Sequence, residues 1–397
     1  MDMDQVELFA QKSDVDNNLS DPTVIAKYRL AADIAQDALT KVVARVADGV
    51  RVSELCAFGD EIILSYTSKV YNKNSVEKGI AFPTMISVND CVEYYSPTGE
   101  AGDDVVLRTG DVVKIELGAH IDGYMATNGH TTVINANTAA PVEGRAADVV
   151  CAAHFAAEAA LRLMKIGNNN IQVQEAIAEA AALFNCSPVT GTASNEIKRY
   201  VIATEKMIMN VPDEENRPVQ DFVFVANEAY TLNILISSGD GTCREGALKP
   251  TVFSRNVHQN YNLKLKSARE AFNEINNNFG VFPFSIRALE NKRHRLGVTE
   301  LASHQLLTPY PVYYTRASDR VAQFKMTVLV AANGTTRITP ALPLPYVHSA
   351  YTIPSDSGIA KLLSTDAGVK IVKSGKALAG IGAAEVAAPA QGMDVDM

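Results

Sequence analysis

A lysine stands in the middle of a segment that otherwise predicts a buried β-strand. Residues 321–330 read VAQFKMTVLV, an apolar and β-branched run of strand length with loop residues on both sides. Lys325 is at its centre. An ammonium group is costly to bury unless an opposite charge or hydrogen-bond acceptors surround it. The sequence therefore predicts that Lys325 lies either at a sheet edge or in a polar centre of the fold.

Three other segments supply polar residues for such a centre. Glu116 lies within the strand-like run VVKIELG, and Asn233 lies within the strand-like run YTLNILI. Asn195 ends the short segment GTASN, just before another strand-like run. Two interpretations of Glu116 and Lys325 stay open: an ordinary surface ion pair, or a buried pair in a polar cavity.

The composition excludes several classes of protein. The chain has 397 residues, enough for two domains, although single α/β units of this size are common, and 47% hydrophobic residues suffice for a large core. A net charge of −9 restricts any nucleic-acid site to a local patch. The five widely spaced cysteines indicate reduced intracellular thiols rather than a disulfide framework. No stretch reaches the ~18 apolar residues of a membrane span, and the acidic N-terminus lacks an apolar signal core. We therefore expect no contact with a membrane.

The chain divides into three parts. Residues 1–19 read as a disordered acidic lead, and residues 366–397, rich in Ala, Gly and Val, read as a flexible tail. Residues 20–365 alternate a helix pair, strands, a second helix pair and strands. Asp21 and Pro22 predict the start of the first helix, because they supply a capping residue and a first-turn proline. Strand runs are expected at 110–134, 199–211, 221–236 and 321–338.

Several motifs resemble those of the type 2 methionine aminopeptidases. They are FPTMISVN at 82–89, KIELG at 114–118, SSGDG at 237–241 and AQF at 322–324. Three more resemble the non-peptidase branch of that group, the proliferation-associated (ErbB-receptor-binding) proteins, whose fungal members are described as curved-DNA-binding proteins. They are LKLKSAR at 263–269, PFSIRALE at 283–290 and GVTEL at 297–301. The resemblance covers about residues 10–363.

This resemblance implies an α+β fold of the pita-bread (creatinase/aminopeptidase) type. Two α+β halves then surround a curved antiparallel sheet in one domain, residues 20–365. A helical insertion is expected at about residues 255–309, with helices at 267–279 and 298–307.

The resemblance also implies a metal site that has been lost. The peptidases hold two metal ions with two aspartates, one histidine and two glutamates. The five positions fall here on Glu116, Thr127, Asn195, Asn233 and Lys325, and a substrate-contacting histidine falls on Tyr94. One carboxylate remains, and Lys325 adds a repelling positive charge, so two hard cations could not be held. We therefore expect no metal, no cofactor and no peptidase activity, and we expect Lys325 to pair with Glu116 in the old cavity.

The expected insertion is the most basic part of this acidic chain. Residues 255–295 carry eight basic side chains against three acidic ones: Arg255, Lys264, Lys266, Arg269, Arg287, Lys292, Arg293 and Arg295 against Glu270, Glu274 and Glu290. The cluster is interpreted either as a solvated face or as a phosphate-binding surface, because charge this uneven focuses a field. The interleaved aromatic residues are interpreted mainly as helix core rather than as base-stacking platforms.

The relatives in the non-peptidase branch associate with ribosomes, bind structured RNA and take part in ribosome biogenesis and growth control. The resemblance therefore implies a non-catalytic protein that binds the large ribosomal subunit or ribosomal RNA, in the cytoplasm and nucleus and with the nucleolus as a further location. An alternative is a DNA-binding regulator, although no helix-turn-helix or zinc finger favours DNA. An active metallo-aminopeptidase is the third candidate.

Overall fold

An antiparallel sheet organises the molecule. The computed structural model describes residues 17–73, 76–100, 102–213 and 218–368. The sheet has nine strands in the order β1-β2-β3-β13-β7-β5-β6, with β14 paired to β13 and β4 paired to β7. Its strands are β1 (Lys78–Val88), β2 (Val112–Ile121), β3 (Tyr124–Val133), β4 (Ser187–Pro188), β5 (Ala193–Ile197), β6 (Met207–Met209), β7 (Glu228–Ser237), β13 (Val321–Ala331) and β14 (Gly334–Arg337).

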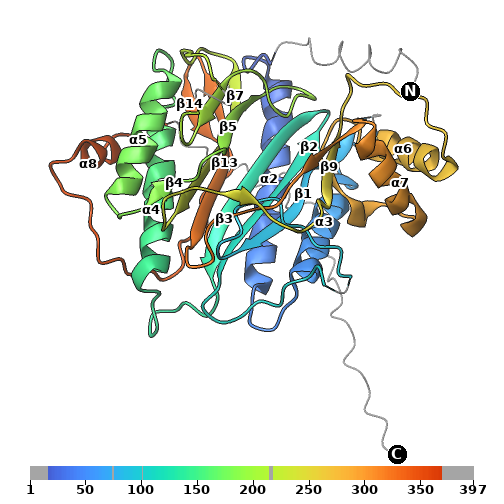
Figure 1. Cartoon of the computed structure of the whole chain (residues 1–397). Helices are drawn as coiled ribbons and strands as arrows, with labels where there is room; N and C mark the ends of the chain where they lie inside the picture. Colours follow the sequence, from blue (N-terminus) through green and yellow to red (C-terminus); the bar gives the residue numbers. More distant parts are fainter. Residues whose placement is uncertain (1–16, 74–75, 101, 214–217, 369–397) are drawn as a thin grey trace, which may run out of the picture.

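Two helix pairs pack against this sheet (Figure 1). They are α2 (Pro22–Arg45) with α3 (Val52–Thr67), and α4 (Gly144–Leu163) with α5 (Asn170–Ala182). Helix α2 lies on β2 and β3, α3 on β1, and α4 on β13 and β7. The short helix α8 (Gly358–Leu363) lies against α4 and α5. The order of elements is the one expected from the sequence.

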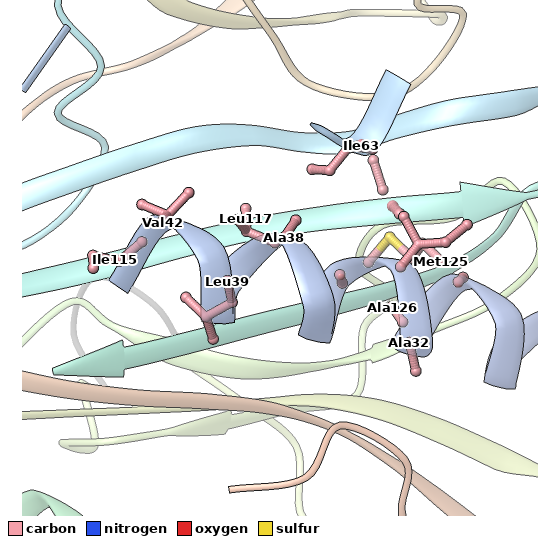
Figure 2. Packing of buried hydrophobic residues seen from close by; sticks show 14 of the residues in the cluster. Ala32, Ala38, Leu39, Val42, Ile63, Ile115, Leu117, Met125 and Ala126 are labelled. Carbon is pink, nitrogen blue, oxygen red and sulfur yellow. The ribbon is translucent and has the colours of Figure 1, made fainter. Parts of the chain in front are cut away.

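The alternation of side chains along each strand separates an apolar face from a polar face. Ala38 and Val42 of α2 pack against Ile115 and Leu117 of β2 (Figure 2). The next residues along β2 and β13 point to the opposite face of the sheet. That face carries the polar residues whose strand positions looked anomalous in the sequence.

The region expected to be a helical insertion forms a small unit of its own. Its three-stranded sheet has the order β10-β9-β11, and its two helices pack on each other. The elements are β9 (Val252–Arg255), α6 (Lys266–Asn278), β10 (Phe284–Ser285), the 3₁₀ helix η1 (Ile286–Ala288), α7 (Lys292–Ser303) and β11 (Leu307–Tyr310). A two-stranded sheet of β8 (Arg244–Glu245) and β12 (Tyr313–Tyr314) lies nearby in sequence. Helices α6 and α7 lie at the opposite end of the molecule from α8 (Figure 1).

Residues 17–19, which were expected to belong to the acidic lead, pack against the domain. Leu19 is buried, and the Asn17 side chain accepts a hydrogen bond from the Tyr28 hydroxyl at 2.8 Å. Asp21 caps α2 by accepting from the Thr23 amide at 2.8 Å, as the sequence predicts. At the other end, Ala367 packs against the core. Residues 1–16 and 369–397 of the expected lead and tail lie outside the described residues.

Three expected elements are placed differently in the structure. The strand run expected at 221–236 begins only at Glu228, as β7. The run 199–211 forms a strand only at Met207–Met209; before it, Arg199 turns away to pair with Asp122 at 2.6 Å. Helix α7 begins at Lys292 rather than at about 298, because Asn291 caps it by accepting from the Arg293 amide at 2.9 Å. The densest basic cluster is therefore the first turn of a helix. Within the part of the chain that the structure describes, no helix is both long and apolar enough to cross a bilayer.

Candidate functional site: a buried ion pair and a basic insertion

Lys325 is buried at the centre of the sheet and forms an ion pair with Glu116. Its residue partners in register are Asn233 on β7 and Gly129 on β3. The Lys325 Nζ lies 2.6 Å from Glu116 Oε2, and the two side chains are 8% and 3% exposed. Such burial excludes the surface-pair interpretation. The structure therefore contains the buried Lys325–Glu116 pair that the sequence analysis predicted.

Gly129 makes the close packing around this pair sterically feasible. A Cβ atom on Gly129 would lie 2.8 Å from the Cβ of Lys325 and 3.4 Å from that of Glu116. Real Cβ atoms do not approach so closely, so any other residue would push β3 away from β13. The absence of a side chain at Gly129 thus lets β2, β3 and β13 pack closely enough for Glu116 and Lys325 to meet.

Amide side chains connect the ion pair to a second carboxylate. Gln323 Nε2 donates to Glu116 Oε2 at 3.3 Å and to Asn233 Oδ1 at 2.8 Å. Asn233 Nδ2 in turn donates to Glu93 Oε2 at 3.4 Å. The other oxygen of the Glu116 carboxylate, Oε1, is buried without a hydrogen-bond partner. The network therefore contains two carboxylates: Glu116 contacts the Lys325 ammonium group directly, and Glu93 is linked to it through Asn233 and Gln323.

Glu93 is the functional candidate that sequence reasoning missed. It is buried, and burial together with the Glu116 charge raises its pKa to about 7, against the opposing effects of Lys325, Tyr94 and Asn233. It lies between β1 and β2 in a segment without regular structure, so no strand pattern predicts which way it points. The only signal in the sequence is its position next to Tyr94, which the resemblance had placed at the cavity.

Tyr94 closes the site with a small group of aromatic rings. Its backbone has φ = 69°, a left-handed conformation that is uncommon for a residue with a side chain. Its ring packs edge-on against Tyr310 at 5.1 Å between centroids, and Tyr310 packs against Phe82 at 6.2 Å. The Lys325 Nζ lies 5.1 Å from the centroid of Phe82, where the ring attracts its charge. Burial raises the pKa of Tyr94 well above its usual value.

The last two expected positions flank this centre rather than join it. Thr127 Oγ1 lies 3.1 Å from Thr231 Oγ1, and its amide donates to Thr327 Oγ1 at 2.9 Å. Asn195 is half-buried and lies opposite Thr231 in the β5–β7 register, so it shares that face of the sheet. The structure therefore brings Glu116, Asn233 and Lys325 into one network, with Tyr94 beside it and with Thr127 and Asn195 further along the same face.

This donor set does not fit a pair of metal ions. A dinuclear site of hard cations requires several carboxylate or imidazole ligands. Here two carboxylates face neutral amides, and an ammonium group already occupies the space between the strands. Among the residues with described positions, no group of three or more His, Cys, Asp or Glu side chains could hold a metal ion.

His130 lies near this centre in sequence but faces the other way. Its ring contacts Phe324 at 5.6 Å, and burial lowers its pKa to about 4. Together with His154 and Leu39 it lines a small hollow between α2 and α4. It contributes nothing to the polar face.

The basic candidates of the insertion divide into exposed and buried groups. Five side chains are exposed on α6, on the segment before it and on the first turn of α7: Lys264, Lys266, Arg269, Lys292 and Arg293. The predicted surface is therefore smaller than charge counting suggested. The other three candidates need correction.

Arg255 is a structural residue. It is 5% exposed and donates to the carbonyl oxygens of Leu306 at 3.1 Å and Gln259 at 3.2 Å. Its guanidinium lies over the ring of Phe272 at 4.6 Å, and burial lowers its pKa to about 10. It ties β9 to the core of the insertion and cannot reach a phosphate in this conformation.

Arg287 and Arg295 are engaged with the main domain. Arg287 pairs with Asp60 at 2.6 Å, with both side chains 12% exposed. Arg295 pairs with Glu100 at 3.0 Å, although Glu100 is largely exposed. Net charge cannot distinguish such anchoring arginines from free ones, because the partners lie about 200 residues away in the chain.

The aromatic residues of the insertion are mostly buried, as the sequence predicts: Phe272 and Phe284 lie in its own core, and Phe282 lies in the main core against His120 of β2. Phe272, Phe282 and Phe284 are buried, and Phe279 is half-buried and stacks on Phe284 at 4.7 Å. Tyr261 is the exception: it is exposed and stacks on His304 at 3.6 Å between centroids.

Comparison with known proteins agrees with this geometry. A sequence model of metallopeptidase family M24 matches residues 26–200. Proliferation-associated protein A of Dictyostelium discoideum is 39% identical over 342 residues, which cover 86% of this chain and 88% of that protein. Curved DNA-binding protein of Schizosaccharomyces pombe is 35% identical over 366 residues, covering 91% of this chain and 94% of that protein. The solved structure of a thermophilic Arx1 superposes with a TM-score of 0.80 at 27% identity, covering 87% of this chain and 99% of that chain.

The fold and site thus define a protein of the pita-bread class in which an internal ion pair stands at the sheet centre. Within that class, the chain belongs to the family of proliferation-associated (ErbB-receptor-binding) proteins and their fungal curved-DNA-binding relatives.

Proposed function

We propose that this protein is a non-catalytic member of its fold class that binds the large ribosomal subunit, or its precursor, through ribosomal RNA. The observation that carries the proposal is the set of exposed cations on one unit of an otherwise acidic chain. Lys264, Lys266, Arg269, Lys292 and Arg293 lie on α6, just before it and on the start of α7. Phosphate contacts by such side chains supply affinity that depends strongly on salt.

The absence of catalysis is part of the proposal. Metal-assisted hydrolysis needs an ion that activates water and polarises the scissile carbonyl. Lys325 occupies the centre of the sheet face and holds Glu116 at 2.6 Å, so its ammonium charge opposes the entry of a divalent cation. The network would serve instead as a fixed polar support beneath the segment that carries Glu93 and Tyr94. A role in ribosome biogenesis or translation, exercised in both cytoplasm and nucleus, follows from the resemblance.

The test is the change of Lys292 and Arg293 together to glutamate. Both are exposed, and neither belongs to the anchoring contacts of the insertion. We expect weaker binding to purified large subunits and to ribosomal RNA in filter-binding assays. Log affinity falls linearly with log salt concentration, and losing two phosphate contacts should make this dependence less steep, reducing the magnitude of the slope by about 2. Lys361→Glu on α8, at the opposite end of the molecule, is a control for a single charge reversal on another surface.

Binding that is unchanged in the double variant would place the RNA contact elsewhere. Ribosomal RNA competitors should remove bound protein more effectively than curved or straight duplex DNA. The reverse order would favour the second candidate, a DNA-binding regulator, which the name of the Schizosaccharomyces pombe relative suggests. Imaging of the tagged protein tests the distribution between cytoplasm and nucleus.

The third candidate is an active peptidase, which the name of the matching metallopeptidase family suggests. Its test is hydrolysis of methionyl peptides after incubation with Mn²⁺, Co²⁺ or Zn²⁺. The proposal requires no turnover with any of these ions. Turnover that is abolished by chelation would overturn it.

A further inference from the structure

The Arg287 side chain extends from the insertion and contacts the main domain, which is the nine-stranded sheet with its covering helices. It lies in η1, between α6 and α7, where Ser285 accepts a hydrogen bond from its amide at 3.3 Å. Its guanidinium donates through Nη2 to Asp60 Oδ2 at 2.6 Å. Through Nη1 it donates to Ser96 Oγ and to the Pro97 carbonyl oxygen, each at 3.0 Å. A single side chain therefore reaches both α3 and the segment between β1 and β2.

Asp60 is itself fixed from two sides. Its Oδ1 accepts from the Thr84 amide on β1 at 2.7 Å, while its Oδ2 holds Arg287. The preceding residue, Gly59, lies so close to β1 that an added Cβ would be 2.3 Å from Thr84 Oγ1. The carboxylate is thus held rigidly at the junction of α3 and β1.

One apolar contact also joins the insertion to the main core: Phe282 is buried there and stacks on His120 of β2 at 4.1 Å between centroids. The other polar contacts in this region are weaker or more exposed than the Arg287–Asp60 pair. Thr251 Oγ1 donates to the Ser96 carbonyl oxygen at 2.7 Å, a single neutral hydrogen bond. The Arg295–Glu100 pair has a Glu100 side chain that is 68% exposed, and exposed pairs contribute little. The Arg287–Asp60 pair is 12% exposed on both sides and forms charge-assisted hydrogen bonds, which are the stronger kind.

We propose that Arg287 is a positioning residue that fixes the insertion on the main domain and thereby presents the exposed cations of α6 and α7 in one orientation. The inference rests on the proposed function, because it concerns how that surface is presented to ribosomal RNA. Arg287 acts without touching RNA. Its position in η1, between the two helices, means that its release moves both of them together.

Two measurements on the full-length chain test this inference. The first needs no RNA: spin labels at Ser65→Cys on α3 and Ser303→Cys on α7, both exposed sites, report the distance between the main domain and the insertion. The half-buried Cys151 and Cys243 are changed to serine in this background. We expect a narrow distance distribution in the parent chain, a broad one in R287Q and D60N, and partial narrowing in R287K. Unchanged distributions in R287Q and D60N would overturn the inference.

The second measurement is the affinity for ribosomal RNA. If the competent orientation falls to about a tenth of the population, the apparent affinity falls roughly tenfold. We expect that loss in R287Q and D60N, partial recovery in R287K, and none in the charge-matched control K361Q. Hydrogen exchange must show α6 and α7 still protected in R287Q. A broad distance distribution with unchanged RNA affinity, or loss of affinity with α6 and α7 unfolded, would refute the positioning role.

The spin-label and RNA-affinity measurements distinguish failure of this inference from failure of the proposed function. If the Lys292 and Arg293 double variant binds RNA normally, the proposed RNA surface is wrong, and the spin-label distances still decide whether Arg287 holds the insertion in place.

Discussion

Replacing Lys325 by methionine should destabilise the protein by about 3 kcal/mol, because removing one partner of a buried pair leaves the other charge uncompensated. The parent pair is 2.6 Å apart with side chains 8% and 3% exposed, so water cannot take over the role of the ammonium. Glu116 would then face Glu93 with only amide donors between them. Methionine keeps the unbranched length of lysine, so the change in packing is small.

The assay is urea unfolding at pH 8, followed by circular dichroism and by fluorescence of an extrinsic dye. The control is Lys361→Met, a lysine exposed on α8, which should change the free energy of unfolding by less than about 0.5 kcal/mol. The double variant K325M/E116Q should cost clearly less than the sum of the two single changes, since the second change removes the stranded charge. A K325M variant as stable as the control, or strictly additive single changes, would refute the buried-pair reasoning.

Three further outcomes are expected. Because the folded pKa of Glu93, about 7, lies above its usual 4.5, the folded state binds the proton more tightly, and the free energy of unfolding falls as pH rises through that window. In E93Q the free energy of unfolding should not show this decrease with pH. Between pH 4.5 and about 7 the difference between E93Q and the parent should therefore grow in favour of E93Q, by up to about 1.4 kcal/mol per pH unit. Parallel stability profiles of the two proteins against pH in calorimetry would contradict this prediction. Gly297→Ala should lower the melting temperature by the equivalent of about 1–3 kcal/mol, because its Cβ would lie 2.8 Å from the Ser267 carbonyl oxygen, and a stabilised variant would show that α6 and α7 do not pack so closely. Excess EDTA should leave the melting temperature unchanged, and elemental analysis should find no stoichiometric divalent metal; a chelator-dependent loss would restore the peptidase interpretation.

Much of the fold could be predicted because its strands are long and their anomalies are local. The run around Lys325 reads as a strand whatever surrounds it, and the family motifs place it beside Glu116. Alternation then puts both side chains on one face of the sheet. The pairing at Gly129 could not be predicted, since it depends on how β3 and β13 pack.

The errors over Glu93, Arg255 and Arg287 arise from tertiary contacts, whereas the error over the start of α7 arises from a local cap. Glu93 could not be predicted because it lies in an irregular segment held by residues more than 200 positions later: the Val92 amide donates to the Tyr313 carbonyl oxygen at 2.7 Å. Arg255 and Arg287 were counted with the free cations because composition records charge and not burial. The predicted start of α7 is six residues too late, because the run of charged residues after Asn291 is typical of a loop unless Asn291 is recognised as a helix cap.

The most direct test of the proposed role is sedimentation of cell extract through gradients at low and at high salt, followed by blotting for this protein. We predict that the protein comigrates with the large ribosomal subunit at low salt and leaves it at high salt, and that the Lys292 and Arg293 double variant is depleted from that fraction. Absence of the parent protein from ribosomal fractions at every salt concentration would contradict the proposal and make the DNA-binding interpretation the leading one.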